Sequence, residues 1–198
     1  MGLAAAQADR RCRPAGGEPN AGKSTFLAAV SAAKPKIAAY PFTTLHPNLG
    51  VVSIGERDFV LADIPGLIEG ASEGVGIGDR FLGHIERCGV LIHLIDGTQD
   101  DVSRAYKSIR YELAAYDERL GEKQEIVVLN KIDSIPADEL KEKVKILKKL
   151  SKQDVLQVSA VTGKGTDMVL YGVIEALDAQ KAARLEAARR KVEPNWAP

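Results

Sequence analysis

The stretch GEPNAGKS at residues 17–24 fits the pattern G-x-x-x-x-G-K-[ST]. In this pattern the backbone N–H groups of a glycine-containing loop surround nucleotide phosphates, and the helix that follows directs its positive end at them. We expect Lys23 to place its charge between the outer phosphates and the Ser24 hydroxyl to bind Mg²⁺. A lone match of this kind also occurs by chance, so the rest of the chain has to support it.

Three further motifs follow in the order that a guanine-nucleotide switch requires. The first is Asp-Ile-Pro-Gly at residues 63–66, directly after a β-branched run. An aspartate at a strand end is placed to reach Mg²⁺ indirectly, and we expect the Gly66 amide to contact the γ-phosphate. The alternative is an aspartate that caps a Pro-Gly turn.

The other two motifs predict a pocket for the base. Asn-Lys-Ile-Asp at residues 130–133 closes the next apolar strand, and Ser159-Ala160 follows the last one. A carboxylate at Asp133 can accept two hydrogen bonds from the edge of guanine, whereas adenine has no matching donors. The Ala160 amide would complete the pocket. The alternative is a strand-end turn with a helix cap, but together the four motifs indicate a GTPase and disfavour an ATPase.

The pattern beyond residue 17 alternates short β-branched runs with longer helical stretches, which is typical of an α/β domain with a parallel sheet. We expect a mostly parallel six-stranded sheet, or a five-stranded one if the first strand is missing, with helices on both faces. The expected helices are 24–33, 101–120, 137–150 and 167–190, and the expected strands are 49–54, 58–62, 90–96, 125–129 and 155–158, with the first two strands forming a hairpin.

The segment before the phosphate loop does not fit this fold. A central strand is nearly all apolar, but residues 8–16 contain three arginines and a proline. Buried charges and a missing ladder donor exclude such a strand. We therefore expect residues 1–16 to be disordered or non-native, through a frameshift or a mis-joined gene end. The expected domain boundaries are therefore a nucleotide-binding (G) domain at 17–180 and a helical extension with a disordered tail at 181–198.

Composition sets outer limits on function. The 198 residues carry 27 basic and 27 acidic side chains, so nothing global points to nucleic acid or membranes. The two cysteines, Cys12 and Cys88, match neither a disulfide framework nor a metal site, which favours a reduced, cytoplasmic compartment. No apolar run is long enough to span a membrane. We expect a soluble monomer.

The blocks at residues 17–27, 40–50 and 63–71, with GDRFL at 78–82 and HIER at 84–87, resemble the bacterial Obg (CgtA) GTPases. The resemblance implies a Ras-like P-loop domain that hydrolyses GTP, exchanges GDP easily and assists assembly of the large ribosomal subunit. It also implies a role in stress and growth control. Two departures from the family pattern are expected: the family's glycine-rich N-terminal domain has no counterpart within these 198 residues, and Glu18 stands where the family usually has an apolar residue.

By motif position, the resemblance implies a first switch at Phe42 to His46, with Thr44 on Mg²⁺ beside Ser24. Lys23, Thr44 and Gly66 are the expected catalytic residues. The full expected set of nucleotide contacts is Gly17, Glu18, Pro19, Asn20, Ala21, Gly22, Lys23, Ser24, Phe42, Thr43, Thr44, Leu45, His46, Asp63, Ile64, Pro65, Gly66, Asn130, Lys131, Ile132, Asp133, Ser159, Ala160 and Val161.

Catalysis is expected to be slow, because Leu67 cannot orient a water as a glutamine would. Asn20 leaves two interpretations open, a K⁺ site that replaces an arginine finger or a simple loop cap. The alternatives for the whole chain are a catalytically weak nucleotide sensor and a truncated, inactive gene product. Two further predictions concern structure. His93 is a satisfied core histidine, and a solvated helix face is favoured over an RNA site for the lysines at 141, 143, 145, 148, 149 and 152.

Overall fold

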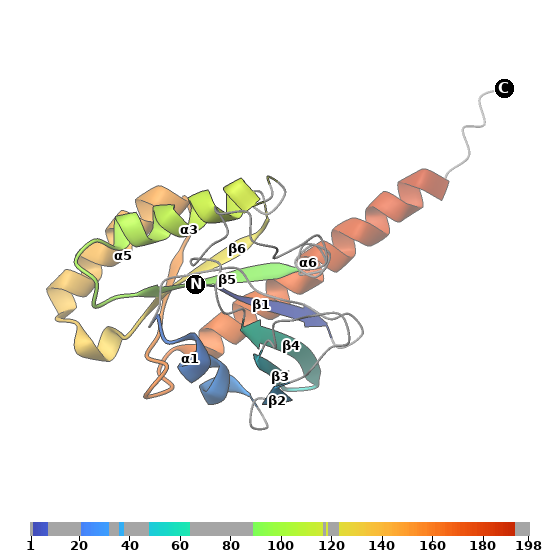
Figure 1. Ribbon diagram of the computed structural model, residues 1–198. Helices are drawn as coiled ribbons and strands as arrows, with labels where there is room; N and C mark the ends of the chain where they lie inside the picture. Colours follow the sequence, from blue (N-terminus) through green and yellow to red (C-terminus); the bar gives the residue numbers. More distant parts are fainter. Residues whose placement is uncertain are drawn as a thin grey trace.

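The computed structural model describes residues 2–7, 21–31, 36–37, 48–63, 89–116, 118 and 123–192, which form a sheet with helices on both faces (Figure 1). The strands are β1 (Gly2–Gln7), β2 (Lys36–Ile37), β3 (Asn48–Ile54), β4 (Arg57–Asp63), β5 (Val90–Asp96), β6 (Glu125–Asn130) and β7 (Val155–Gln157). The helices are α1 (Lys23–Val30), α3 (Val102–Tyr116), α5 (Ala137–Ser151) and α6 (Thr166–Val192), with a 3₁₀ turn at Ile132–Ser134.

The sheet has seven strands in the order β2-β3-β4-β1-β5-β6-β7 among the described residues. Only the pairs β5·β6 and β6·β7 are parallel, and the other four pairs are antiparallel. The prediction of a mostly parallel six-stranded sheet is therefore wrong in strand number and in direction. The α/β class and the helices on both faces are confirmed.

The first strand is present, but it runs in the opposite direction from the one that the fold pattern predicts. β1 lies between β4 and β5 and is antiparallel to both, with Leu3 opposite Asp63 and Ala5 opposite Val90. Its sequence, GLAAAQ, is small and apolar, so it can fill a central slot that the arginine-rich segment after it cannot. Residues 8–20 lie outside the described part of the chain, and the frameshift hypothesis stays a prediction.

The strands on either side of β1 run in the same direction as each other, although β1 itself is reversed. Because β1 is antiparallel to β4 and to β5, these two strands run the same way, and β6 and β7 follow β5 in parallel. The carboxyl ends of β4, β5, β6 and β7 therefore meet at one edge of the sheet. Ligands of open α/β sheets bind at this edge.

Two hydrophobic cores, one on each face, hold the layers together. One joins the sheet to α1 and α6 through Phe26, Leu27 and Val173. The other joins it to α3 and α5 through Tyr106 and Leu147. Val90–Asp96 is buried along its whole length, as expected for a strand that has helices on both sides.

Most elements beyond residue 20 match their prediction. The hairpin β3–β4 is antiparallel and turns at Gly55, whose φ of 59° a glycine adopts without strain. β5 is confirmed at both of its ends, and the predicted helices at 24–33, 137–150 and 167–190 correspond to α1, α5 and α6. These elements depend on local signals, namely apolar spacing and turn residues.

Lys143 contradicts the prediction of a solvated lysine face. It is only 5% exposed, and its ammonium donates to the carbonyl oxygens of Gly97 and Gln99, each at 2.8 Å. Glu139, one turn earlier on α5, lies 2.5 Å from the same nitrogen. A buried charge of this kind persists because every donor has an acceptor. The remaining lysines of this set are exposed, as predicted.

The last part of α6 leaves the body of the molecule (Figure 1), and residues 181–189 are all exposed. Alanine, arginine, glutamate and leucine dominate it, and their high helix propensity explains why the helix continues there. None of the described helices combines the length and the apolar character that crossing a lipid bilayer requires.

Candidate nucleotide site

The end of the phosphate loop is built around Gly22. This residue caps α1 with a left-handed backbone, φ 83° and ψ 26°. A Cβ there would lie 2.5 Å from Nδ2 of Asn130, so both the conformation and the close approach require glycine. Lys23 and Ser24 follow in the first turn of α1, where the positive end of the helix dipole favours an anion.

Asn130 connects the phosphate loop to the base motif. Its side chain is 1% exposed; Nδ2 donates to the Ala21 carbonyl at 2.8 Å, and Oδ1 accepts from the Ala160 amide at 3.0 Å. One amide group thus bridges three segments that lie far apart in the sequence. The end of the phosphate loop, the base motif and the segment Ser159-Ala160 therefore lie next to one another.

The residues after Asn130 form a tight turn. Lys131 has a left-handed backbone, φ 64°, and the 3₁₀ turn Ile132–Ser134 follows it directly. The Ile132 amide donates to the Val158 carbonyl at 3.3 Å, which joins the turn to the end of β7. Asp133 is exposed at this turn, where a ligand can reach it.

Hydrogen bonds keep the Asp133 carboxylate ionised. The Ser159 hydroxyl contributes most, and the Asp133 backbone amide and the Ser134 hydroxyl add to it, so the pKa of Asp133 lies below its ordinary value. An ionised carboxylate is acceptor-only, which suits the donor edge of guanine. Val161, the last of the predicted nucleotide contacts, directly follows Ser159-Ala160 and is 78% exposed.

Asp96 and Lys131 form an ion pair beside this turn that was not predicted. Oδ2 of Asp96 lies 2.6 Å from the Lys131 ammonium, and the two side chains are 8% and 31% exposed. Burial would raise the pKa of Asp96, but hydrogen bonds from Lys131 and Thr98 outweigh it, so its pKa is lowered. A strand-end aspartate followed by Gly97-Thr98 is the sequence signal that could have revealed it.

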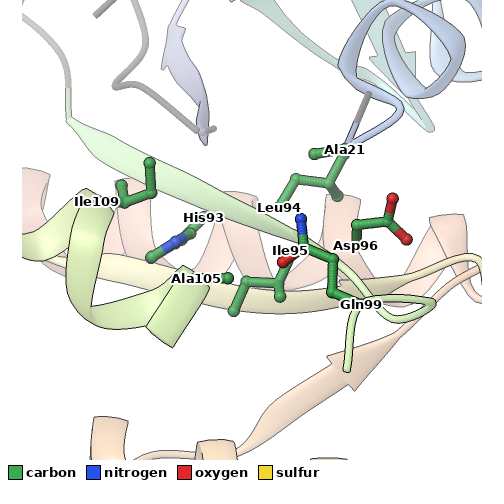
Figure 2. A pocket seen from close by; sticks show the side chains of 8 residues that line it. All are labelled: Ala21, His93, Leu94, Ile95, Asp96, Gln99, Ala105 and Ile109. Atoms are coloured by element: carbon green, nitrogen blue, oxygen red, sulfur yellow. The ribbon is translucent and has the colours of Figure 1, made fainter. Parts of the chain in front are cut away.

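A small cavity under this edge is lined by β5, α3 and Ala21. Figure 2 shows His93 and Ile109 at one end of it and Ala21 with Asp96 at the other. Its volume is about 10 Å³, which is about the space of one water molecule. A nucleotide therefore does not bind in it, and the open sheet edge above is the candidate site.

The prediction that His93 is a satisfied core histidine is only half correct. His93 is 2% exposed, stacks on Tyr106 at 5.0 Å between ring centroids, and donates through Nδ1 to Glu125 at 3.4 Å. The other ring nitrogen, Nε2, has no hydrogen-bond partner among the described residues. Burial lowers the pKa of His93, although the bond to Glu125 opposes this.

The unfolding free energy should fall on acidification because of His93. Its pKa is lowered in the folded protein, so below about pH 6.5 the unfolded chain takes up a proton that the folded protein excludes. The slope approaches about 1.4 kcal/mol per pH unit for one proton. Urea unfolding at several pH values should show this loss, and His93→Phe, which keeps the stacking, should flatten it between pH 7 and 5.5. An equal slope in the variant would contradict the prediction.

The phosphate loop and the turns described above match a known family. The family model described as "50S ribosome-binding GTPase" matches residues 16–131, more than half of the 198-residue chain. The chain belongs to the 50S ribosome-binding GTPase family. The matched range ends within the base motif, after Asn130 and Lys131, and Ser159-Ala160 lies beyond it.

Solved structures of GTPases share the fold. A putative nucleolar GTP-binding protein 1 from Plasmodium falciparum is 21% identical, with a TM-score of 0.64 over 89% of this chain and 90% of that one. The G domain of the T. maritima FeoB iron transporter is 21% identical, with a TM-score of 0.56 over 84% and 94%. Era, solved with MgGDPNP and part of 16S ribosomal RNA, is 24% identical, with a TM-score of 0.59 over 81% and 54%.

Several predicted site residues lie outside the described part of this GTPase-family chain. These are residues 17–20 of the phosphate loop, the first switch at 42–46 and residues 64–66 of the second motif. Asp63 is described by its backbone, as the last residue of β4 at the site edge. Their assigned roles stay predictions.

The donor set fits a Mg²⁺ ion that is held largely by the nucleotide. The described residues contain no group of three or more histidine, cysteine, aspartate or glutamate side chains that could hold a metal. Ser24 offers a hydroxyl oxygen, and Mg²⁺ commonly completes its shell with substrate phosphates and water. When bound, the ion would neutralise charge on the phosphates.

Removing the Asn130 bridge should cost both stability and binding. Asn130→Ala would leave the Ala21 carbonyl and the Ala160 amide buried without a partner, at about 1–3 kcal/mol each. We expect a loss of about 2–4 kcal/mol in unfolding free energy and weaker nucleotide binding. Urea titration and calorimetry with GDP measure the two effects. A variant as stable as the parent would rule out the bridge.

Proposed function

We propose that this protein binds guanine nucleotides and slowly hydrolyses GTP to GDP and phosphate, as an Obg-type switch in the assembly of the large ribosomal subunit. The observation that carries the proposal is the Asn130 side chain, which joins the end of the phosphate loop to the base loop. Such a bridge sets the distance between a phosphate site and a base site. A nucleotide is the ligand that has both groups at its two ends.

Each residue has a separate task in the proposed reaction. The Lys23 ammonium compensates charge that develops on the transferred phosphoryl group, and the amides at the start of α1 hold the phosphates. Ser24 with Thr44 would hold Mg²⁺, and Gly66 would contact the γ-phosphate. Asp133, kept ionised by Ser159, accepts from the guanine edge. Leu67 in place of a glutamine supports slow turnover.

The link to the ribosome is supported by family membership and by the Obg-like blocks in the sequence. The matched family is described as ribosome-binding, and a large subunit in the cytoplasm is the partner that fits this description. The overall neutral charge means that contact with ribosomal RNA would rely on a local surface. We also propose a monomer with a G domain at 17–180, and K⁺ as an ion that Asn20 could help to bind.

The test is GTP turnover by the purified full chain, with and without large ribosomal subunits. Slow release of phosphate from GTP, faster with subunits and not inhibited by ATP, is expected. Nucleotide binding without any turnover would favour the alternative of a guanine-nucleotide sensor. Absence of binding to GDP or GTP by a folded protein would contradict the proposal. Equal rates in K⁺ and Na⁺ buffers would exclude the K⁺ site.

A further inference from the structure

The backbone of Lys131 is held in a conformation that lysine does not adopt readily. Its φ of 64° and ψ of 34° are left-handed, which costs about 1–2 kcal/mol for a residue with a side chain. Lys131 directly precedes the 3₁₀ turn that carries Asp133. The direction of the Asp133 carboxylate therefore depends on whatever keeps Lys131 in this conformation.

Asp96 is the side chain that holds Lys131. It ends β5, and its Cα is the register partner of Asn130 on the neighbouring strand. One carboxylate oxygen receives the Lys131 ammonium at 2.6 Å. The other accepts from both the backbone amide and the hydroxyl of Thr98, at 2.9 and 2.7 Å. The carboxylate is thus oriented before any ligand arrives.

The loop that follows Asp96 is itself anchored from two sides. The Gly97 amide donates to the Asn130 carbonyl at 2.9 Å. From α5, the buried Lys143 ammonium donates to the carbonyls of Gly97 and Gln99. Movement of Asp96 away from Lys131 would break several of these contacts at once. The ion pair therefore has a rigid acceptor side and a more exposed donor side.

We propose that Asp96 is a positioning residue for guanine selectivity, acting through Lys131 on the orientation of Asp133. The inference rests on the proposed binding of guanine nucleotides. Asp96 acts without contacting the ligand. It keeps the Lys131 backbone left-handed, so that the turn presents Asp133 toward the base, and it prevents the lysine ammonium from pairing with Asp133 itself.

A purely structural ion pair would act differently. If Asp96 only stabilised the fold, its loss would lower the affinity for every nucleotide by the same factor. If it positions Asp133, its loss should affect the hydrogen bonds that Asp133 makes. Inosine diphosphate separates the two cases, because it differs from GDP only in lacking the 2-amino group, one of the two donors that Asp133 would accept from.

The experiment compares GDP and inosine diphosphate by calorimetry on the full chain and on Asp96→Asn. The parent should prefer GDP by about 10- to 100-fold, the value of one hydrogen bond to a charged group. In Asp96→Asn this preference should fall by about tenfold. Asp101→Asn is the matched control: Asp101 accepts a similar set of bonds, but from the Ser103 and Arg104 amides at the start of α3 and not from the base turn. Asp101→Asn should prefer GDP over inosine diphosphate by the same factor as the parent.

A double variant keeps the test decisive if Asp96→Asn folds poorly. Asp96→Asn/Lys131→Met removes both charges, which a half-buried pair tolerates better than the loss of one. Lys131→Met alone should lower the preference, and adding Asp96→Asn should lower it no further. An unchanged GDP preference in Asp96→Asn, or an added loss in the double variant, would overturn the inference. A parent that binds neither nucleotide would instead overturn the proposed function.

Discussion

Replacing Asp133 with asparagine is expected to lower GDP affinity by about 100- to 10,000-fold, the value of two hydrogen bonds to a charged acceptor. The carboxylate accepts at both oxygens, whereas an amide accepts at one atom and donates at the other. The donating NH₂ would then face the 2-amino group of guanine. The loss should be specific to guanine because Asp133 is exposed and ionised. Its turn is also held in place by the hydrogen bond from the Ile132 amide to the Val158 carbonyl, directly after β7.

The same variant should gain affinity for xanthosine diphosphate. Xanthine has a carbonyl oxygen at the position of the guanine 2-amino group, so it offers the acceptor that the new NH₂ group needs. Calorimetry with GDP, xanthosine diphosphate and ADP measures the change, and the gain shows that the variant is folded. Asp138→Asn, on the exposed first turn of α5, is the control and should bind GDP like the parent. Unchanged GDP affinity in Asp133→Asn would exclude Asp133 from the base site.

Loss of the Lys23 ammonium is expected to slow hydrolysis of bound GTP by about 100- to 1,000-fold. Lys23 is the first residue of α1, directly after the left-handed Gly22, so its side chain starts at the positive end of the helix. In Lys23→Ala the helix dipole and the amides remain, but the positive charge that would lie between the outer phosphates is gone. The folded structure should change little, since Lys23 lies at a helix end.

Single-turnover hydrolysis at saturating GTP measures this effect separately from binding. Lys141→Ala on α5 is the matched control, because Lys141 is an exposed lysine far along the sequence from the phosphate loop, and its rate should equal that of the parent. Circular dichroism should give the same helix content for all three proteins. A Lys23→Ala rate within about threefold of the parent would show that the lysine does not act on the transition state.

The part of the candidate site that the structure describes could be predicted from the sequence because its motifs are local. The phosphate loop, the strand-end aspartate and the Asn-Lys-Ile-Asp turn each occupy a few consecutive residues. Strand ends in an α/β pattern also indicate which residues share an edge. The meeting of Ala21, Asn130 and Ala160 is the observed form of that expectation.

The errors share one physical cause, which is that their partners lie far away in the chain. The run of lysines on this helix favours a solvated face for Lys143, but the acceptors of its ammonium lie in the loop at 97–99. Asp96 pairs with Lys131, 35 residues later. No pattern within one helix or one strand contains this information.

Residue order alone determined the α/β class, most of the helices and strands beyond residue 20, and the proximity of the base motif to the end of the phosphate loop. It did so because apolar spacing, turn residues and strand ends act over short distances. Only the tertiary structure decided the direction of β1 and the pairing of Asp96 with Lys131. A short strand of mainly small apolar residues can pair with a neighbour in either direction. A charge can be buried wherever a partner meets it, so both outcomes depend on the assembled sheet.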